Sequence, residues 1–413
     1  MSSPAPAQLE ADAVGSGLPA RFSARPTVAR CMPDINTPQE PSPSAPDIVL
    51  VLGGGNALGA YLAGACEQLY EHGIEPRRIV GVSMGAVTGA ILAGNPPGRR
   101  LDRLRAFWAE AAQADTPLGW LEGGWSRRMR NAAHLAFAST FGRPPIFRPR
   151  VPGLWAQLPW MAEDVAIFDL GPLAEALDRF VDFDLLNRGP TRLSVGTLDL
   201  ETGGEVFFDT DTTPIRAEHI LASTAQLSVF PPVELNGRLL GDPGYTNNLP
   251  VDRALANPPQ RNTVCFAVDP FSLDGAPPRT MDEALGRAHE LMFAGAVRRN
   301  VEALRREYTL HQRMEPRGAS VTLVHLSYRP PAHELAARMF EYSERSIRDR
   351  WEAGRHDMAA ALTRLERHTP TGRFTYLPAV ERTVPEGTAA RGQGEPAAPT
   401  MAVGVWPLPA GDI

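Results

Sequence analysis

The order of apolar and polar residues predicts alternating strands and helices in the first part of the chain. Ile48–Leu52 is an unbroken apolar run that ends in three glycines, which is typical of a buried parallel strand followed by a tight turn. The pattern then predicts a helix over 58–72, a second strand at Arg78–Val82 and a small-residue helix over 86–93. This order of strand, helix, strand and helix indicates a parallel α/β sheet.

Further elements are expected downstream, and they extend the same architecture. Strands are predicted at 192–198, 205–209, 238–240, 263–268 and 321–326. Helices are predicted at 173–180, 217–222, from about 280 to 304, and over 333–365. The pattern as a whole predicts an α/β fold with a mostly parallel central sheet and a helical C-terminal extension.

Composition divides the chain into four segments. Residues 1–46 are rich in Pro, Ser and Ala and lack apolar periodicity, so they are expected to be disordered. Residues 385–413 form a similar tail, expected to be flexible. Between the tails we expect a globular α/β domain at 47–275 and a mainly helical extension at 276–384.

Residues 98–160 form a distinct insert in the predicted α/β domain, because they hold most of the tryptophans among several arginines. One interpretation is a cap over a binding site, or a surface where Trp and Arg meet lipid headgroups. The other is an ordinary helical layer with Trp in its core, which is favoured because buried Trp is common and no clear amphipathic pattern is present.

Composition and charge exclude several kinds of chemistry. All 41 residues counted as Lys or Arg are Arg, which excludes Schiff-base enzymes, Ser–Lys dyads, P-loops and protein kinases. The net charge of −6 offers no basic field for nucleic acid. Cys31, Cys66 and Cys265 are isolated, so neither a disulfide framework nor a structural metal site is expected. Without a long apolar run or a signal segment, a cytoplasmic protein is expected.

The strongest local motif is a G-x-S-x-G formed by Gly81, Ser83 and Gly85, between a predicted strand and a predicted helix. A nucleophile on a strained strand-to-helix turn has crowded neighbours, so the flanking positions need residues without side chains. The N-terminus of the next helix supplies N–H donors and positive potential. The context favours Ser83 as a nucleophile over a turn without chemistry.

A second motif is the Gly-rich turn Gly53-Gly54-Gly55, which continues through Asn56 to Gly59. Consecutive glycines let backbone N–H groups converge on an anion, which is either a phosphate or the oxyanion of an acyl-transfer reaction. A dinucleotide is disfavoured, because the glycine spacing fails and no acidic ribose ligand follows the next strand. The oxyanion hypothesis explains why this turn and the serine turn occupy adjacent βα loops.

The third signal is Asp242, which follows a predicted strand in a Gly-rich turn. An Asp in this place can act as the general base for a serine hydroxyl. Taken alone, the turn favours a structural Asx turn over a catalytic role, because Asp-Pro-Gly is common turn chemistry. Histidines after Asp242 would suit a Ser–Asp–His order. However, His325 lies within an apolar strand and the others fall on helical or polar stretches, so none is expected to be catalytic.

Together these motifs resemble the patatin-like phospholipase family. The four blocks that carry the resemblance are residues 50–60, 81–85, 222–233 and 242–250, which are similar to the family's oxyanion, nucleophile, pre-aspartate and aspartate blocks. The resemblance runs from about Asp47 to Asp269. Residues 343–354 are also similar to the C-terminal extension of a bacterial patatin-like subfamily.

The resemblance implies a patatin-like three-layer α/β/α fold and a serine acyl hydrolase of phospholipase A, lysophospholipase or esterase type, without metal or cofactor. It implies that Ser83 attacks the ester carbonyl and that Asp242 takes its proton directly. It implies an oxyanion hole built from backbone N–H groups of Gly54, Gly55 and Asn56. The residues that support these motifs are Gly53, Gly59, Gly81, Gly85 and Gly244.

Two departures from the family pattern leave alternatives open. Leu58 stands where the family usually carries a basic residue, and Pro243 removes one N–H from the aspartate turn. An esterase for short hydroxyacyl or polyester substrates, or a degenerate module that binds lipid or a protein, therefore stays in consideration. The expected partner is a lipid or acyl-ester substrate, with peripheral contact to the inner membrane left open and no nucleic acid. Acyl length, headgroup and oligomeric state are not fixed by the sequence.

Overall fold

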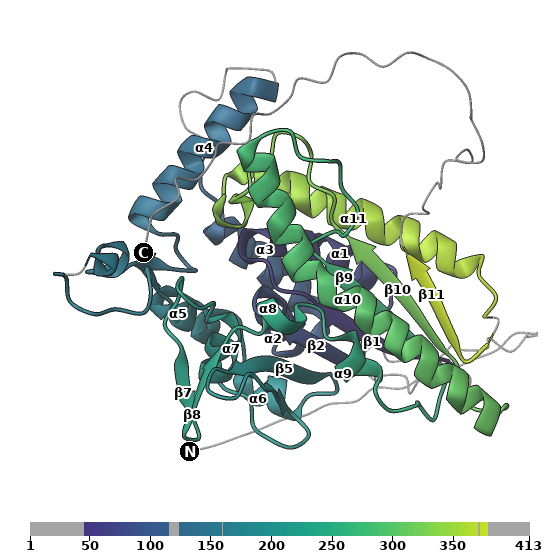
Figure 1. Ribbon diagram of the computed structural model, residues 1–413. Coiled ribbons are helices and arrows are strands. Elements are labelled where there is room, and N and C mark those ends of the chain that lie inside the picture. Colours follow the sequence, from purple (N-terminus) through teal and green to yellow (C-terminus); the bar gives the residue numbers. More distant parts are fainter. Residues whose placement is uncertain (1–44, 115–123, 159, 371, 379–413) are drawn as a thin grey trace, which may run out of the picture. The chain divides into compact units, whose positions relative to one another are not determined.

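The computed structural model describes residues 45–114, 124–158, 160–370 and 372–378 (Figure 1). Most of the N-terminal tail predicted to be disordered, and all of the C-terminal tail predicted to be flexible, lie outside these residues. So does Trp120 of the insert.

One mixed sheet forms the centre of the described chain. It has nine strands in the order β11-β10-β9-β1-β2-β5-β8-β7, with β6 paired to β5. The strands are β1 (Asp47–Leu52), β2 (Arg78–Val82), β5 (Arg192–Asp199), β6 (Glu205–Asp209), β7 (Val233–Leu235), β8 (Arg238–Gly241), β9 (Thr263–Asp269), β10 (Val321–Ser327) and β11 (Phe374–Pro378). All pairs from β11 to β5 are parallel, whereas β6, β7 and β8 pair antiparallel. The predicted, mostly parallel α/β sheet is confirmed.

The remaining described elements are helices and one short strand pair. The α-helices are α1 (Gly59–Glu71), α2 (Met84–Ala93), α3 (Arg100–Ala111), α4 (Gly124–Phe141), α5 (Gly171–Phe180), α6 (Phe183–Arg188), α7 (Ala217–Thr224), α8 (Gly244–Asn247), α9 (Val251–Leu255), α10 (Met281–Met314) and α11 (Glu344–Glu366). The 3₁₀ turns are η1 (Asn56–Leu58), η2 (Pro97–Arg99), η4 (Gly153–Gln157) and η5 (Arg338–Phe340). The strand pair is β3 (Arg148–Pro149) with β4 (Phe168–Asp169).

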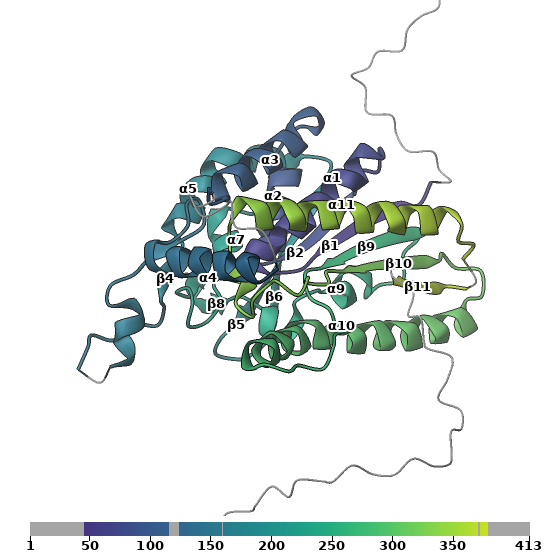
Figure 2. The same cartoon turned by 90° about the horizontal axis from the view of Figure 1, so that it is seen from above.

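Alternation along the strands builds an apolar core on each face of the sheet. In β1, Leu50 and Leu52 belong to the core cluster that contains side chains of α1, α2 and α11. Val49 and Val51 belong to the second cluster, with side chains of α9 and α10. Figure 2 shows the sheet between α1 and α11 on one side and α10 on the other. A strand buried on both faces explains why this segment reads as an unbroken apolar run.

The C-terminal extension is continuous with this fold, because β10 and β11 extend the same sheet and α11 packs along α1. At the crossing, a Cβ on Gly64 would lie 1.9 Å from the carbonyl oxygen of Trp351, and one on Gly354 would lie 2.1 Å from that of Tyr61. The two helices can approach this closely only because both positions lack a side chain.

One helix prediction is wrong in its first part. A helix was expected over 333–365, but α11 begins at Glu344, after the turn η5. The Ser343 side chain caps the helix by accepting a hydrogen bond from the Ser346 amide at 3.3 Å. Upstream, Glu334 and Glu341 bind arginines through buried contacts that hold the chain in an irregular path. Tertiary contacts override the helical periodicity in this segment.

The aromatic insert at 98–160 contains both buried and exposed tryptophans. Trp108 on α3 is buried in the main core. Trp155 on η4 and Trp160 after it are 66% and 77% exposed, and Phe141 at the end of α4 is 64% exposed. An ordinary helical layer therefore accounts for Trp108 on α3, but not for the exposed Trp155 and Trp160.

Candidate active site

Ser83 lies in the turn between β2 and α2, at the carboxyl edge of the sheet. Its backbone has φ 54° and ψ −125°, outside the regions that L-residues normally adopt. The Ser83 amide donates to the Ser223 hydroxyl at 2.8 Å, and that hydroxyl donates to the Gly196 carbonyl at 2.6 Å. The strained turn is therefore held from β5 and α7, which lie far away in sequence.

The glycines on either side of Ser83 are required by backbone crowding. A Cβ on Gly81 would lie 2.6 Å from the carbonyl oxygen of Gly85. A Cβ on Gly85 would lie 2.2 Å from the carbonyl oxygen of Leu52 at the end of β1. Real Cβ atoms do not approach backbone this closely, so the G-x-S-x-G spacing reflects the contact of α2 with β1 and β2.

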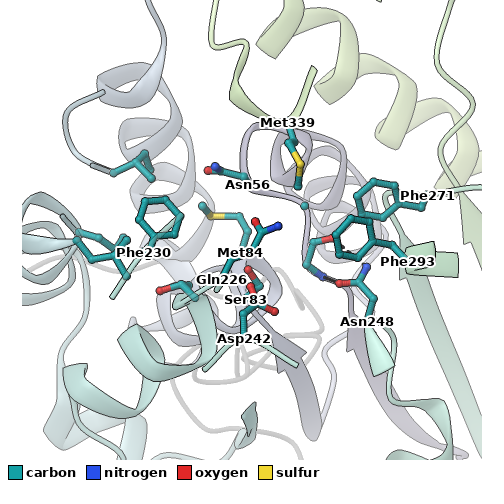
Figure 3. A pocket seen from close by; sticks show the side chains of 16 residues that line it. Asn56, Ser83, Met84, Gln226, Phe230, Asp242, Asn248, Phe271, Phe293 and Met339 are labelled. Atoms are coloured by element: carbon teal, nitrogen blue, oxygen red, sulfur yellow. Dashed lines mark hydrogen bonds between the residues drawn. The ribbon is translucent and has the colours of Figure 1, made fainter. Parts of the chain in front are cut away.

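Asp242 follows β8 and lies beside Ser83 at the bottom of the pocket (Figure 3). Its Oδ1 accepts a hydrogen bond from the Gly244 amide at 2.8 Å. Because the donor is the Gly244 amide, the carboxylate keeps this hydrogen bond although Pro243 has no N–H. Burial raises the pKa of Asp242 to about 6, and hydrogen bonding to Ser83 and Gly244 partly offsets the rise.

The Gly-rich turn after β1 is held against the serine turn by Asn248. The Gly54 amide donates to Asn248 Oδ1 at 3.2 Å, and Asn248 Nδ2 donates to the Gly54 carbonyl at 3.0 Å. A Cβ on Gly54 would lie 2.6 Å from the Ser83 Cβ. Since the Gly54 N–H is already bonded, Gly55 and Asn56 offer the free backbone N–H groups of this turn. The structure gives neither of them an acceptor within the described chain.

The pocket over Ser83 is narrow and largely apolar, with a cavity volume of about 20 Å³. Figure 3 shows Phe230 on one side of it, Phe271 and Phe293 on the other, and Met339 above. Further apolar lining comes from Met84, Ile146, Leu170 and Leu173. Such walls suit the apolar part of a substrate, while the polar groups converge at Ser83 and Asp242.

Several residues around this site were missed by sequence reasoning. Ser223 and Asn248 fall inside the family-like blocks, but nothing in their spacing indicates that they bind the Ser83 amide and the Gly54 backbone. Met339 and Tyr342 come from the C-terminal extension, and Tyr342 donates a hydrogen bond to Asn56. These contacts join positions far apart in sequence, which a local pattern cannot reveal.

The structure also shows where the histidines and Leu58 lie relative to the pocket. Among the described residues, no histidine lines the pocket; His325 instead lies on β10, where its Nδ1 is 2.8 Å from the Tyr376 hydroxyl. Leu58, where the family pattern has a basic residue, is fully buried in the main core cluster. An Arg there would bury a charge in an apolar environment.

Two family models match the chain. Residues 50–255 match the model of the patatin-like phospholipase family, and residues 296–371 match a second model described as patatin phospholipase. The chain belongs to the patatin-like phospholipase family. The second match covers most of α10, β10 and α11, so it includes the C-terminal segment that contributes Met339 to the pocket.

Individual relatives are distant. The chain is 25% identical to lysophospholipase NTE1 of Yarrowia lipolytica over 58% of this chain and 14% of that protein. It is 29% identical to an uncharacterized NTE family protein of Mycobacterium bovis over 50% of this chain and 45% of that protein. The chain thus spans less than half the length of these relatives. The crystal structure of VipD from Legionella pneumophila is 16% identical over 75% of this chain and 68% of that one, with a TM-score of 0.32.

The described part of the chain contains no helix with the length and apolar character needed to cross a bilayer. The same residues contain no cluster of three or more His, Cys, Asp or Glu arranged to hold a metal ion.

Proposed function

We propose that this protein is a serine acyl hydrolase that cleaves carboxylic esters of lipids through a Ser83–Asp242 dyad and an acyl-enzyme intermediate. The observation that carries the proposal is the pairing of a strained, glycine-flanked serine with a buried carboxyl group of raised pKa. The apolar pocket and the family membership support a lipid ester as the substrate.

In the proposed reaction, Ser83 Oγ attacks the ester carbonyl carbon while Asp242 takes the hydroxyl proton. The N–H groups of Gly55 and Asn56, together with Gly54 if it leaves Asn248, stabilise the oxyanion. When the intermediate collapses, Asp242 returns the proton to the leaving alcohol, and Ser83 keeps the acyl group. Water then attacks the acyl-enzyme with Asp242 again as base, which releases the carboxylic acid and restores the serine.

Burial of Asp242 suits it to this role. An ordinary Asp is too acidic to accept a proton efficiently near neutral pH, whereas a pKa of about 6 makes the carboxylate a better base and still leaves it largely ionised at pH 7. No histidine is then needed between serine and aspartate.

The test is a panel of p-nitrophenyl and phospholipid esters assayed with wild type, Ser83→Ala and Ser320→Ala. Ser320 is half-buried and lies at the opposite edge of the sheet, before β10, so its variant is the matched control. Ser83→Ala is expected to lose ester hydrolysis and labelling by a fluorophosphonate, while Ser320→Ala keeps both. Equal hydrolysis by Ser83→Ala contradicts the proposal, and absence of labelling in the folded wild type supports a degenerate binding module.

The narrow cavity favours a second candidate function, an esterase for short hydroxyacyl or polyester substrates. A volume of about 20 Å³ does not hold a long acyl chain unless the aromatic walls move. A series of p-nitrophenyl esters of increasing chain length separates the two candidates. A fall in kcat/KM beyond short chains supports the second, and a rise with chain length or sn-2 phospholipid cleavage rejects it.

We also propose peripheral contact with a membrane through the exposed part of the insert. Val151, Leu154, Trp155 and Trp160 are all more than half exposed in one stretch of chain, and Trp side chains favour the boundary between lipid and water. Vesicle sedimentation with wild type and a Trp155→Ala/Trp160→Ala variant tests the contact. Equal binding of the two proteins contradicts it.

A further inference from the structure

Asn56 has an unsatisfied side-chain donor beside the nucleophile. It begins η1, directly after the Gly-rich turn, and its φ of 52° lies in the left-handed region. Its Oδ1 accepts a hydrogen bond from the Tyr342 hydroxyl. Its Nδ2 is buried and has no acceptor among the described residues, although Asn56 lines the pocket that contains Ser83. A buried donor without a partner is unfavourable unless another state of the protein supplies an acceptor.

Tyr342 contacts the oxygen end of this amide. In the structure the Tyr342 hydroxyl donates to Asn56 Oδ1, and this orientation of the amide leaves Nδ2 for the pocket. Tyr342 is fully buried, and its carbonyl accepts a hydrogen bond from the Gln113 amide at 2.7 Å. The tyrosine therefore has little freedom to turn away from Asn56.

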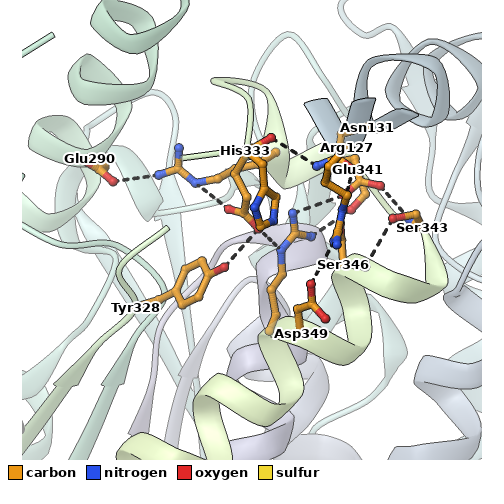
Figure 4. Close-up of polar contacts among 12 residues, drawn as sticks. Arg127, Asn131, Glu290, Tyr328, His333, Glu341, Ser343, Ser346 and Asp349 are labelled. Atoms are coloured by element: carbon orange, nitrogen blue, oxygen red, sulfur yellow. Dashed lines mark hydrogen bonds and ion pairs between the residues drawn. The ribbon is translucent and has the colours of Figure 1, made fainter. Parts of the chain in front are cut away.

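Buried ion pairs hold the residues on both sides of Tyr342 in place (Figure 4). Arg350 of α11 is inaccessible to solvent and binds Glu334 at 2.8 Å and the Glu341 carbonyl at 2.8 Å. Arg338 of η5 binds Glu290 of α10 at 2.9 Å. Burying charged pairs is an inefficient way to gain stability, but it can fix one conformation of a segment.

We propose that the Asn56 side-chain amide donates a hydrogen bond to the carbonyl oxygen of the substrate as it becomes an oxyanion, with Tyr342 as its positioning residue. The inference rests on the proposed function, and it adds a side-chain donor to the backbone N–H groups of the Gly-rich turn. It also gives the C-terminal extension a task in the reaction, because that extension supplies Tyr342. Asn56 is suited to the place because Asn tolerates a left-handed backbone and also carries a donor.

The decisive variant is Asn56→Gly, which removes the amide and keeps a residue compatible with positive φ. Loss of one oxyanion donor typically lowers kcat about 10²-fold to 10³-fold. We therefore expect a fall in kcat of about 10²-fold with KM within about twofold of wild type. Asn56→Asp, which also fits the backbone, places a negative charge beside the oxyanion and is expected to be at least as slow.

Tyr342→Phe tests the positioning role, with Tyr308→Phe as the matched control. Tyr308 is equally buried, but its hydroxyl binds the Leu255 carbonyl, on the α10 face of the sheet. We expect about a tenfold lower kcat for Tyr342→Phe and wild-type kcat for Tyr308→Phe, in line with the loss of one hydrogen bond. Because Tyr342 acts through Asn56, adding Tyr342→Phe to Asn56→Gly should cause no further loss.

The outcomes separate this inference from the proposed function. If wild type hydrolyses no ester and no probe labels Ser83, the proposed function itself fails. If wild type is active and folded Asn56→Gly keeps kcat within about threefold, or changes KM alone, Asn56 serves only its backbone conformation and the inference is overturned. Independent, additive losses in the double variant overturn the positioning role of Tyr342.

Discussion

Asp242 is expected to destabilise the folded protein for the same reason that makes it a useful base. Its pKa rises from 3.8 to about 6 on burial, a difference of about 2 units, and each unit corresponds to about 1.4 kcal/mol. The ionised carboxylate therefore costs about 3 kcal/mol of folding free energy above pH 6. Asp242→Asn removes the charge and can still accept the hydrogen bond from Gly244, so the variant should be more stable than wild type.

The pH dependence of stability follows from the direction in which burial shifts the pKa of Asp242. Because the folded state has the higher pKa, it binds the proton more tightly, and wild-type stability falls as pH rises from about 4 through about 6. Urea unfolding should thus show Asp242→Asn nearly equal to wild type at pH 4 and more stable by up to about 3 kcal/mol at pH 8. Asp184→Asn, at an exposed side chain, is the control. A difference that is absent at pH 8, or is the same at both pH values, refutes the reasoning.

Two other predictions concern catalysis and packing. The kcat/KM for ester hydrolysis should rise with pH through about 6 to a plateau, because only ionised Asp242 accepts the serine proton; a flat profile between pH 5 and 8 would reject this role. Gly64→Ala should lower the free energy of unfolding by about 1–3 kcal/mol, because its Cβ would clash with the Trp351 carbonyl. Gly98→Ala is the control, since a Cβ at position 98 would have no atom within 4 Å. Equal urea midpoints for these two variants would contradict the close packing of α1 on α11.

The predictable parts of the fold depend on short-range patterns. The run Ile48–Leu52 indicates a strand buried on both faces, and β1 is covered by a core cluster on each face. G-x-S-x-G predicts a turn with no room for side chains around Ser83, and the close backbone contacts of Gly81 and Gly85 give the physical cause. These features could be found in sequence because each is marked by the residue types of a few consecutive positions.

The parts that could not be predicted depend on partners remote in sequence. The hydrogen bonds from Asn248 to Gly54 and from Tyr342 to Asn56 span 194 and 286 residues. The start of α11 was misplaced because a buried arginine, Arg350, binds the residues expected to be helical. The proposed oxyanion donors illustrate the same limit, since only the structure reveals that the Gly54 N–H is already bonded in the resting state.

We propose above all that Ser83 is a nucleophile activated within this pocket. Its most direct test is intact-protein and peptide mass spectrometry after treatment of the folded protein with a fluorophosphonate. We expect one adduct per chain, located on Ser83, and none on folded Ser83→Ala. An unlabelled wild type, or equal labelling of wild type and Ser83→Ala, would contradict it.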